Sequence, residues 1–167
     1  MATIPYWHVD AFSAEPFGGN QAAVMILDTW LADETLLAIA NENMFAATAF
    51  AVRDAGGAAD WELRWFTPVG EIAMCGHATL AAGHALLSRD GGEQVAFRTR
   101  QAGIVEVRGT GEGYAIDLPA ITTEARDYPE AVALLGAEPL TVLRNDTRHN
   151  IFVFEDEAVV RALNPDF

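Results

Sequence analysis

The segment 77–89, HATLAAGHALLSR, constrains this chain most, because it carries apolar residues on nearly every side of a helix. Its alanines and leucines favour a helix, even with Gly83 in the middle. A helix that is apolar all round is typical of a buried position rather than a surface one. We therefore predict that the rest of the chain wraps around a central helix at 77–89.

Segments with strand character lie on both sides of this helix. Before it they are 4–11, 22–28, 48–53 and 60–66, and after it they are 93–99, 103–108 and 113–118. The unbroken apolar run 22–28 predicts a strand buried on both faces, whereas the later segments alternate as in an antiparallel meander. Asp33 is predicted to cap a helix that follows the second strand. This order favours an α+β fold with a mainly antiparallel sheet curled around the buried helix, not a Rossmann fold.

The pattern predicts a first lobe at 1–118, a linker at 119–128 and the beginning of a second lobe at 129–167. The last block contains a short helix at 130–135, strands at 139–144 and 150–155, and a helix start at 157–163. Its apolar residues are too few to close a core of its own, so we expect the second lobe to be incomplete.

Composition narrows the classes of function. The 167 residues hold 10 Lys and Arg against 24 Asp and Glu, a formal net charge of −14. Such a surface repels phosphate backbones and anionic membranes, so we expect neither as a partner. Cys75 is the only cysteine, which rules out an internal disulfide and a cysteine-built zinc site. The N-terminus lacks the pattern of a secretion signal, and no apolar run approaches the ~20 residues of a membrane span. We therefore expect a soluble cytoplasmic protein.

Two motifs carry candidate chemistry, and each also has a plain structural interpretation. Gly18-Gly19-Asn20 is either a turn that needs positive φ at a glycine or a backbone approach to a small anionic ligand. The segment 74–79, MCGHAT, lies where a loop meets the start of the predicted central helix. Free N–H groups there suit a carboxylate, and the same field would lower a thiol pKa or disfavour an imidazolium. Cys75 and His77 are candidate site residues, or else a small buried hydrophobe and a hydrogen-bonded helix-start residue.

The other histidines give weaker signals. His84 follows His77 by seven residues, so both point the same way, and its expected role is packing. His8 and His149 stand alone on predicted strands. No His-Glu-x-x-His motif, nucleophile elbow or P-loop is present in the sequence, so we expect no metal and no hydrolase chemistry of these kinds.

Four runs of residues together resemble the PhzF-like family of phenazine biosynthesis. They are YWHVDAF at 6–12, PFGGNQAAV at 16–24, WFTPVGE at 65–71 and CGHATLAAGH at 75–84. The resemblance implies the diaminopimelate epimerase-like fold, in which two similar lobes each curl a sheet around a central helix. The active site of that fold lies in the cleft between the lobes, and segment 77–89 would be the central helix of the first lobe.

The resemblance also implies a cofactor-independent isomerase. The phenazine enzyme moves a proton along an allylic system of a dihydro-hydroxyanthranilate, with one glutamate as base and then acid. Backbone amides at Gly76, His77 and Ala78 would hold the carboxylate of a small substrate, and Gly19 and Asn20 would line the same cleft.

Two departures from the family pattern matter. The family glutamate lies in a segment reading roughly Asn-Leu-Ser-Glu-Thr-Ala-Phe, and Ala47 occupies its position here. Alanine cannot transfer a proton, and Glu42 would have to be relocated by about five residues to replace it. The sequence also ends inside the second lobe. It is either a fragment or a half-length protein that pairs, for which a homodimer is the common arrangement.

Cys75 occupies the first-lobe cysteine position of the wider superfamily, but the second-lobe partner is absent from these residues.

Three functions therefore stay open. The first function is an impaired PhzF-like isomerase or epimerase that acts on a small carboxylate. The second is a catalytically silent carboxylate-binding module, and the third is a dimerising half-protein.

Overall fold

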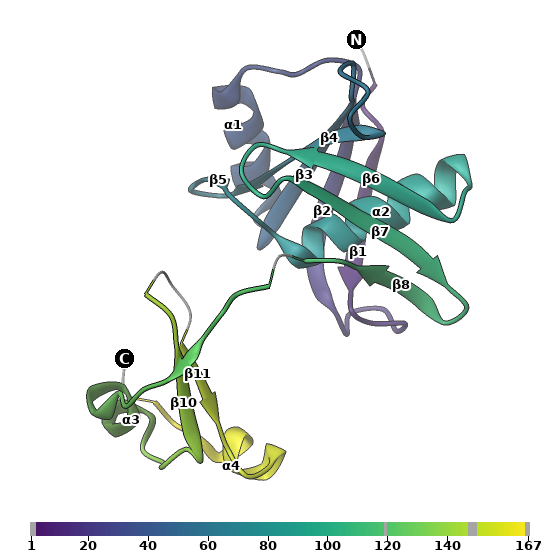
Figure 1. Cartoon of the computed structure of the whole chain (residues 1–167). Coiled ribbons are helices and arrows are strands. Elements are labelled where there is room, and N and C mark those ends of the chain that lie inside the picture. Colours follow the sequence, from purple (N-terminus) through teal and green to yellow (C-terminus); the bar gives the residue numbers. More distant parts are fainter. Residues whose placement is uncertain (1–2, 119, 147–149, 166–167) are drawn as a thin grey trace. The chain divides into compact units, whose positions relative to one another are not determined.

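The computed structural model describes residues 3–118, 120–146 and 150–165, and a long buried helix lies at the centre of the first part. This helix, α2 (Gly76–Asp90), runs through the hollow of a curled sheet (Figure 1). Its buried residues are Ala78, Thr79, Ala81, Ala82, Gly83, Ala85, Leu86 and Leu87. The prediction of a buried central helix over 77–89 is confirmed, with one further residue at each end.

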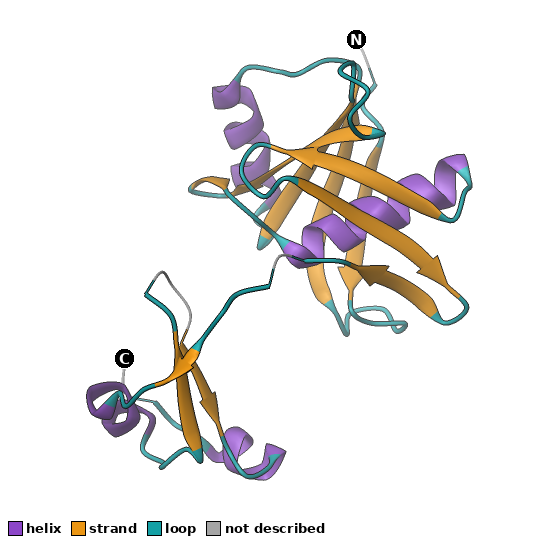
Figure 2. Cartoon of the chain, in the orientation of Figure 1, coloured by secondary structure: helices purple, strands orange, loops and turns teal. Residues whose placement is uncertain are grey.

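The sheet around α2 has the strand order β1-β2-β3-β4-β6-β7-β8, and β5 pairs with β4 beside this path (Figure 2). Its strands are β1 (Tyr6–Ala11), β2 (Asn20–Leu27), β3 (Ala47–Arg53), β4 (Trp61–Thr67), β5 (Gly70–Ile72), β6 (Gln94–Thr99), β7 (Ile104–Thr110) and β8 (Gly113–Ile116). The pairs β2–β3 and β4–β6 are parallel and the other pairs are antiparallel. Each parallel pair has a helix between its strands in the chain, as a crossover requires. The predicted α+β fold with a mainly antiparallel sheet is confirmed, and the two crossovers make the sheet mixed.

β2 is buried on both faces because a helix packs on each side of the sheet. Ala22, Val24 and Ile26 join the apolar cluster around α2. Met25 and Leu27 join a second cluster around the other helix of this unit, α1 (Asp33–Asn43). The unbroken apolar run in the sequence therefore results from alternate residues that serve two separate cores.

Small side chains allow α2 to lie close to the sheet. β3 contributes Ala47, Ala49 and Ala51 to the cluster around α2, and α2 contributes four alanines of its own. On the opposite wall, Gly83 lies directly against Val107 of β7. The position of α2 therefore depends on the absence of bulk at these contacts.

The predicted role of Asp33 as a helix cap is wrong. Ala32 occupies the cap position of α1, no side chain caps the helix, and Asp33 is its first residue. The Asp33 carboxylate instead accepts a hydrogen bond from the guanidinium of Arg64, with an N–O distance of 2.8 Å. A buried arginine, which the local sequence does not reveal, competes successfully for this carboxylate.

The chain divides into two compact units between residues 119 and 120, and the second unit has little interior of its own. Its elements are β9 (Glu124–Ala125), α3 (Pro129–Leu135), β10 (Thr141–Arg144), β11 (Asn150–Val153) and α4 (Glu157–Ala162). Among its described residues only Val142 is buried. Residues 124 and 125, which the sequence assigned to a linker, form β9 and pair antiparallel with β10. His149 lies outside the described residues.

Candidate functional site

One end of the first unit gathers most of the candidate residues. Asn20 opens β2 and Ala47 opens β3, and these strands run parallel with Ala22 beside Ala47. Ala47 belongs to the same apolar cluster as Cys75 and Ala78, which lie at the start of α2. We refer to this end of the unit, with the strand starts at Asn20 and Ala47 and the helix start at Gly76, as the site end.

The start of α2 has no capping side chain. Cys75 takes the cap position with extended backbone angles, φ −147° and ψ 101°, and the helix has no side-chain cap hydrogen bond of standard geometry. The backbone N–H of Ala78 interacts with the Cys75 sulfur, which opposes the effect of burial on the thiol pKa. The first turn also contains no acidic residue. The Thr79 hydroxyl and N–H both donate to the Cys75 carbonyl, so the chain path into the helix is fixed. The first N–H groups are thus directed to the site end with the positive end of the helix dipole.

Cys75 and His77 form a contact pair at this helix start. The Cys75 sulfur lies 3.4 Å from His77 Nδ1, and Cys75 is only 8% exposed. Burial raises the pKa of the Cys75 thiol, against the sequence expectation that the helix field would lower it. The correction has a physical cause: loss of water around the thiolate outweighs the field of the helix start. Cys75 is therefore a protonated thiol at neutral pH and not a preformed nucleophile.

His77 is held as a neutral imidazole. Burial lowers the pKa of His77, while the backbone of Gln21 acts in the opposite direction. His77 Nε2 is buried without a hydrogen bond of standard geometry in the described residues, the ring interacts with the backbone of Gln21, and Nδ1 faces the Cys75 sulfur. A ligand bound at the helix start could therefore use Nε2 as its hydrogen-bond partner.

The lowered pKa of His77 predicts a loss of stability in mild acid. An unfolded histidine titrates near pH ~6.5, so the unfolded chain binds more protons than the folded chain below that pH. The contribution of neutral His77 is fully present above pH ~6.5 and is lost as the pH falls. Between about pH 7.5 and about pH 5 we expect the urea midpoint of the natural chain to fall. The midpoint of His77→Asn should fall less, because asparagine does not titrate. An equal fall of the urea midpoint in the two proteins would contradict the lowered pKa of His77.

The glycines of the Gly18-Gly19-Asn20 turn are not the residues with positive φ. That conformation belongs to Phe17, with φ 66°. Gly19 is instead required by a close approach, because a Cβ atom there would lie 2.5 Å from the Ala11 carbonyl oxygen. The structure thus explains Gly19 by packing against β1, while the exposed Asn20 pairs with Ala11 at the start of β2.

Ala47, which the resemblance predicts to replace the family glutamate, is fully buried with an exposure of 0%. Glu42 lies on the exposed side of α1. The site end therefore brings together the helix start, Cys75, His77 and Ala47, and Asp10, which pairs with Gln21 next to Asn20, has a buried Oδ1 without a hydrogen bond in the described residues.

Three exposed apolar side chains lie next to the strand starts of the site end, Phe12 and Phe17 in the loop between β1 and β2 and Met44 at the C-cap of α1 before β3. Phe12, Phe17 and Met44 are 70%, 94% and 72% exposed. They are also the non-glycine residues with positive φ in the described part of the chain. Positive φ is uncommon for such side chains and persists where the structure enforces it, often at functional sites. The sequence signal was only the presence of aromatic residues in a turn.

His84 lies seven residues beyond His77 on α2, beside the loop that contains Phe12. It lines a cavity of about 470 Å³ together with Asp10, Leu80 and Tyr114. Its ring meets Tyr114 edge-on at a centroid distance of 5.2 Å, and its Nδ1 lies 3.4 Å from the Ser88 hydroxyl. His84 therefore does not join Cys75 and His77 in one constellation.

Two structural features are absent from residues 3–118, 120–146 and 150–165. No three His, Cys, Asp or Glu side chains gather there closely enough to hold a metal ion. None of the helices in these ranges has the length and apolar character needed to cross a membrane.

Comparison with known proteins identifies the family. Residues 9–167 match the family described as phenazine biosynthesis-like protein, PhzC-PhzF. An uncharacterized isomerase of Pseudomonas aeruginosa is 43% identical over 167 residues, which cover 98% of this chain and 62% of that protein. An uncharacterized isomerase of Halalkalibacterium halodurans is 38% identical, with 100% of this chain and 63% of that protein covered.

Solved structures agree with this assignment. The PhzF-family protein of Enterococcus faecalis matches with a TM-score of 0.85 and 39% identity, over 98% of this chain and 62% of that one. The chain thus spans less than two thirds of the length of these relatives. The curled sheet around a buried helix is the diaminopimelate epimerase-like fold of these proteins, and the chain belongs to the phenazine biosynthesis-like, or PhzF-like, family.

Proposed function

We propose that the first unit provides the carboxylate-binding half of a PhzF-like isomerase site. The observation that carries this proposal is the start of α2, which has no side-chain cap hydrogen bond of standard geometry and no acidic residue in its first turn, beside the buried neutral imidazole of His77. Backbone N–H groups of Gly76 and His77 bind the carboxylate of a small substrate, and His77 Nε2 contacts the part of the substrate next to it. Family membership supports an isomerase-type reaction, in which a proton is removed and returned without an external reactant.

Proton transfer at this site is impaired in our proposal. The family resemblance assigns the proton to a glutamate, and the residue at that position is the fully buried Ala47. His77 is held neutral and Cys75 protonated, so the pair can donate and accept hydrogen bonds but lacks the strong base of the family. Binding and positioning are retained, while the chemical step has lost its carboxylate.

The exposed apolar rim of the site end supports a covered cleft. Phe12, Phe17 and Met44 leave a large apolar surface in water beside the proposed binding site. We propose that a second lobe or a partner chain, such as a second copy in a homodimer, covers this rim and excludes water from the substrate.

A proline substitution tests the carboxylate site directly. Gly76 is the first residue of α2, where proline fits a helix and removes one N–H group. Cys75 already has the extended angles that a residue before proline adopts, and a Cβ at Gly76 meets only Leu118 at 3.5 Å. We expect Gly76→Pro to weaken binding of benzoate by about tenfold or more, because a charge-assisted hydrogen bond is lost.

Gly76→Ala is the matched control, since it keeps the N–H and adds a similar Cβ. Titration calorimetry with benzoate, and with neutral benzamide as the uncharged counterpart, measures the effect. Equal benzoate affinity for the proline and alanine variants would contradict a carboxylate site at this helix start.

The alternative function is a silent binding module, and the burial of Ala47 among apolar neighbours favours it. The two functions differ in one observable. A silent module binds dihydro-hydroxyanthranilate without exchanging its protons with deuterated water, whereas an impaired isomerase still catalyses slow exchange. Mass spectrometry of the recovered ligand decides between them.

A further inference from the structure

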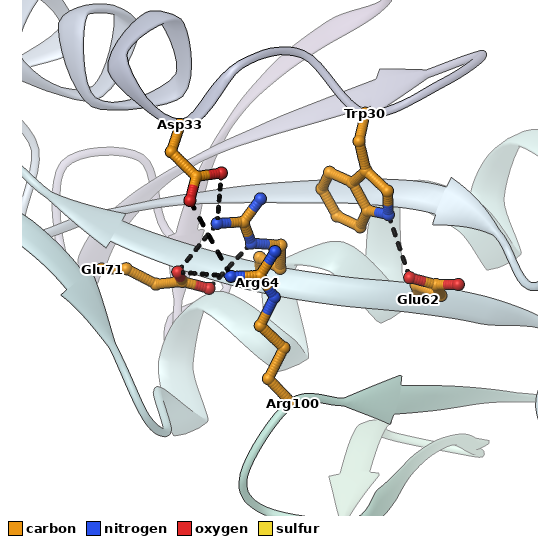
Figure 3. A network of polar contacts seen from close by, with 6 residues as sticks. All are labelled: Trp30, Asp33, Glu62, Arg64, Glu71 and Arg100. Atoms are coloured by element: carbon orange, nitrogen blue, oxygen red, sulfur yellow. Dashed lines mark hydrogen bonds and ion pairs between the residues drawn. The ribbon is translucent and has the colours of Figure 1, made fainter.

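A buried arginine ties together the segments that lead into the site end. Arg64 of β4 is only 3% exposed, and its guanidinium donates to both carboxylate oxygens of Glu71 on β5, each at 2.8 Å. The same guanidinium also donates to Asp33, and Arg100 reaches Glu71 at 3.1 Å (Figure 3). The flat face of the Arg64 guanidinium lies near the rings of Trp30 and Phe66. Arg64 thus has a fixed place and orientation.

The bidentate contact holds both charges in place. Its hydrogen bonds raise the pKa of Arg64 and lower the pKa of Glu71, so both groups are ionised at neutral pH. Two parallel N–H···O bonds define orientation as well as distance. A buried ion pair is weak evidence for stability, because the desolvation cost offsets its attraction. The Arg64–Glu71 pair is therefore more informative about the orientation of the two side chains than about the stability of the fold.

β5 is the element that this contact constrains. It has three residues, Gly70–Ile72, and pairs only with β4, at the side of the main strand path. Residues 73–75 follow without regular structure and lead directly to Gly76, the first residue of α2. The path of this short connection is therefore set by α2 at one end and by β5 at the other. Glu71 is the charged anchor of the β5 end.

We propose, on the basis of the carboxylate site proposed above, that Arg64 and Glu71 are a positioning pair that holds residues 73–76 in the ligand-binding geometry of the α2 start. Neither side chain contacts the ligand. The pair acts through the backbone: Arg64 fixes Glu71, Glu71 fixes β5, and β5 sets where Cys75 and the Gly76 N–H lie. A displacement of about 1 Å at such a site can cost up to about a hundredfold in function.

The chain contains a matched control for this proposal. Glu62 lies on the same strand as Arg64, is partly buried, and pairs with Arg98 and with the indole N–H of Trp30 at 2.9 Å (Figure 3). Trp30 also packs against Arg64, but Glu62 itself forms no hydrogen bond or ion pair with Arg64 or Glu71. Glu62→Gln therefore removes a comparable charge from the same face of the sheet without touching the anchor of β5.

The sole cysteine provides a readout that does not depend on any ligand. Cys75 is 8% exposed and has a raised pKa, so iodoacetamide reacts with it slowly while residues 73–76 stay in place. We expect Glu71→Gln to increase the alkylation rate about tenfold through local opening and to weaken benzoate binding about tenfold. Glu62→Gln should stay within about twofold of the natural chain in both measurements.

A second variant covers the case in which Glu71→Gln unfolds the unit. Arg64→Met combined with Glu71→Leu replaces the ion pair by apolar side chains, which often preserves stability. We expect this variant to fold but to show the same faster alkylation and weaker benzoate binding. The positioning role would be overturned if the double variant kept the alkylation rate and the benzoate affinity of the natural chain. It would also be overturned if Glu62→Gln and Glu71→Gln had equal effects. If the natural chain itself fails to bind benzoate, the carboxylate site is wrong, and the alkylation rates still decide on the pair.

Discussion

Replacing Ala47 with glutamate is expected to increase the exchange of the reacting proton of dihydro-hydroxyanthranilate with solvent by about 10²–10⁴-fold. Ala47 opens β3 at the site end, and it shares one apolar cluster with Cys75 and Ala78 at the start of α2. A carboxylate introduced there lies beside the proposed substrate site. Burial would raise its pKa toward neutrality, which suits a group that must take and return a proton.

The control for this experiment is Ala47→Gln, which has nearly the same size and polarity but cannot transfer a proton. Both variants bury a polar side chain at a position with 0% exposure, so both should lower the free energy of unfolding to a similar degree. Deuterium incorporation into the substrate, followed by mass spectrometry in heavy water, separates the two. Equal incorporation by the glutamate and glutamine variants would show that position 47 does not carry the base.

The core of the first unit was largely predictable because its sequence signals are local. The all-round apolar pattern of 77–89 identified the buried helix, and the unbroken apolar run at 22–28 identified a strand between two cores. The parallel pairings were not predicted, because they depend on which strands become neighbours after each helix crosses over. β9 was missed because a strand of two residues has no periodicity to detect.

Features that depend on distant segments were not predictable. Arg64 pairs with Asp33 and Glu71, and Arg100 pairs with the same Glu71, although these residues are far apart in the sequence. The only local hint was an arginine between the large apolar residues Leu63 and Trp65 of the strand Trp61–Thr67. The thiol pKa of Cys75 was predicted in the wrong direction for the same reason. The helix start is visible in the sequence, but the side chains that bury the sulfur come from elsewhere in the fold.

Replacing Gly83 with alanine distinguishes local propensity from packing, because the two predict opposite signs. In the interior of α2, alanine is favoured over glycine by about 1 kcal/mol. A Cβ at this position, however, would lie 2.4, 2.6 and 2.9 Å from three side-chain atoms of Val107. Val107 is itself fully buried in the core cluster, so it has little room to move. Overpacking of this kind costs up to about 3 kcal/mol, and we expect a net loss of about 2 kcal/mol of unfolding free energy.

Urea unfolding followed by tryptophan fluorescence measures this loss in the first unit alone, because all four tryptophans lie there, at positions 7, 30, 61 and 65. Val107→Ala provides the matched background, since it removes two of the three atoms that the new Cβ would strike and leaves the Cβ of residue 107 at 2.6 Å. In that background Gly83→Ala should cost less than in the natural chain, and the difference between the two backgrounds is the coupling energy of the contact. A stabilising effect of Gly83→Ala in the natural chain would mean that α2 lies farther from β7 than the structure places it. The alanine-lined approach of the helix to β3 would then no longer fix the position of the α2 start beside Ala47.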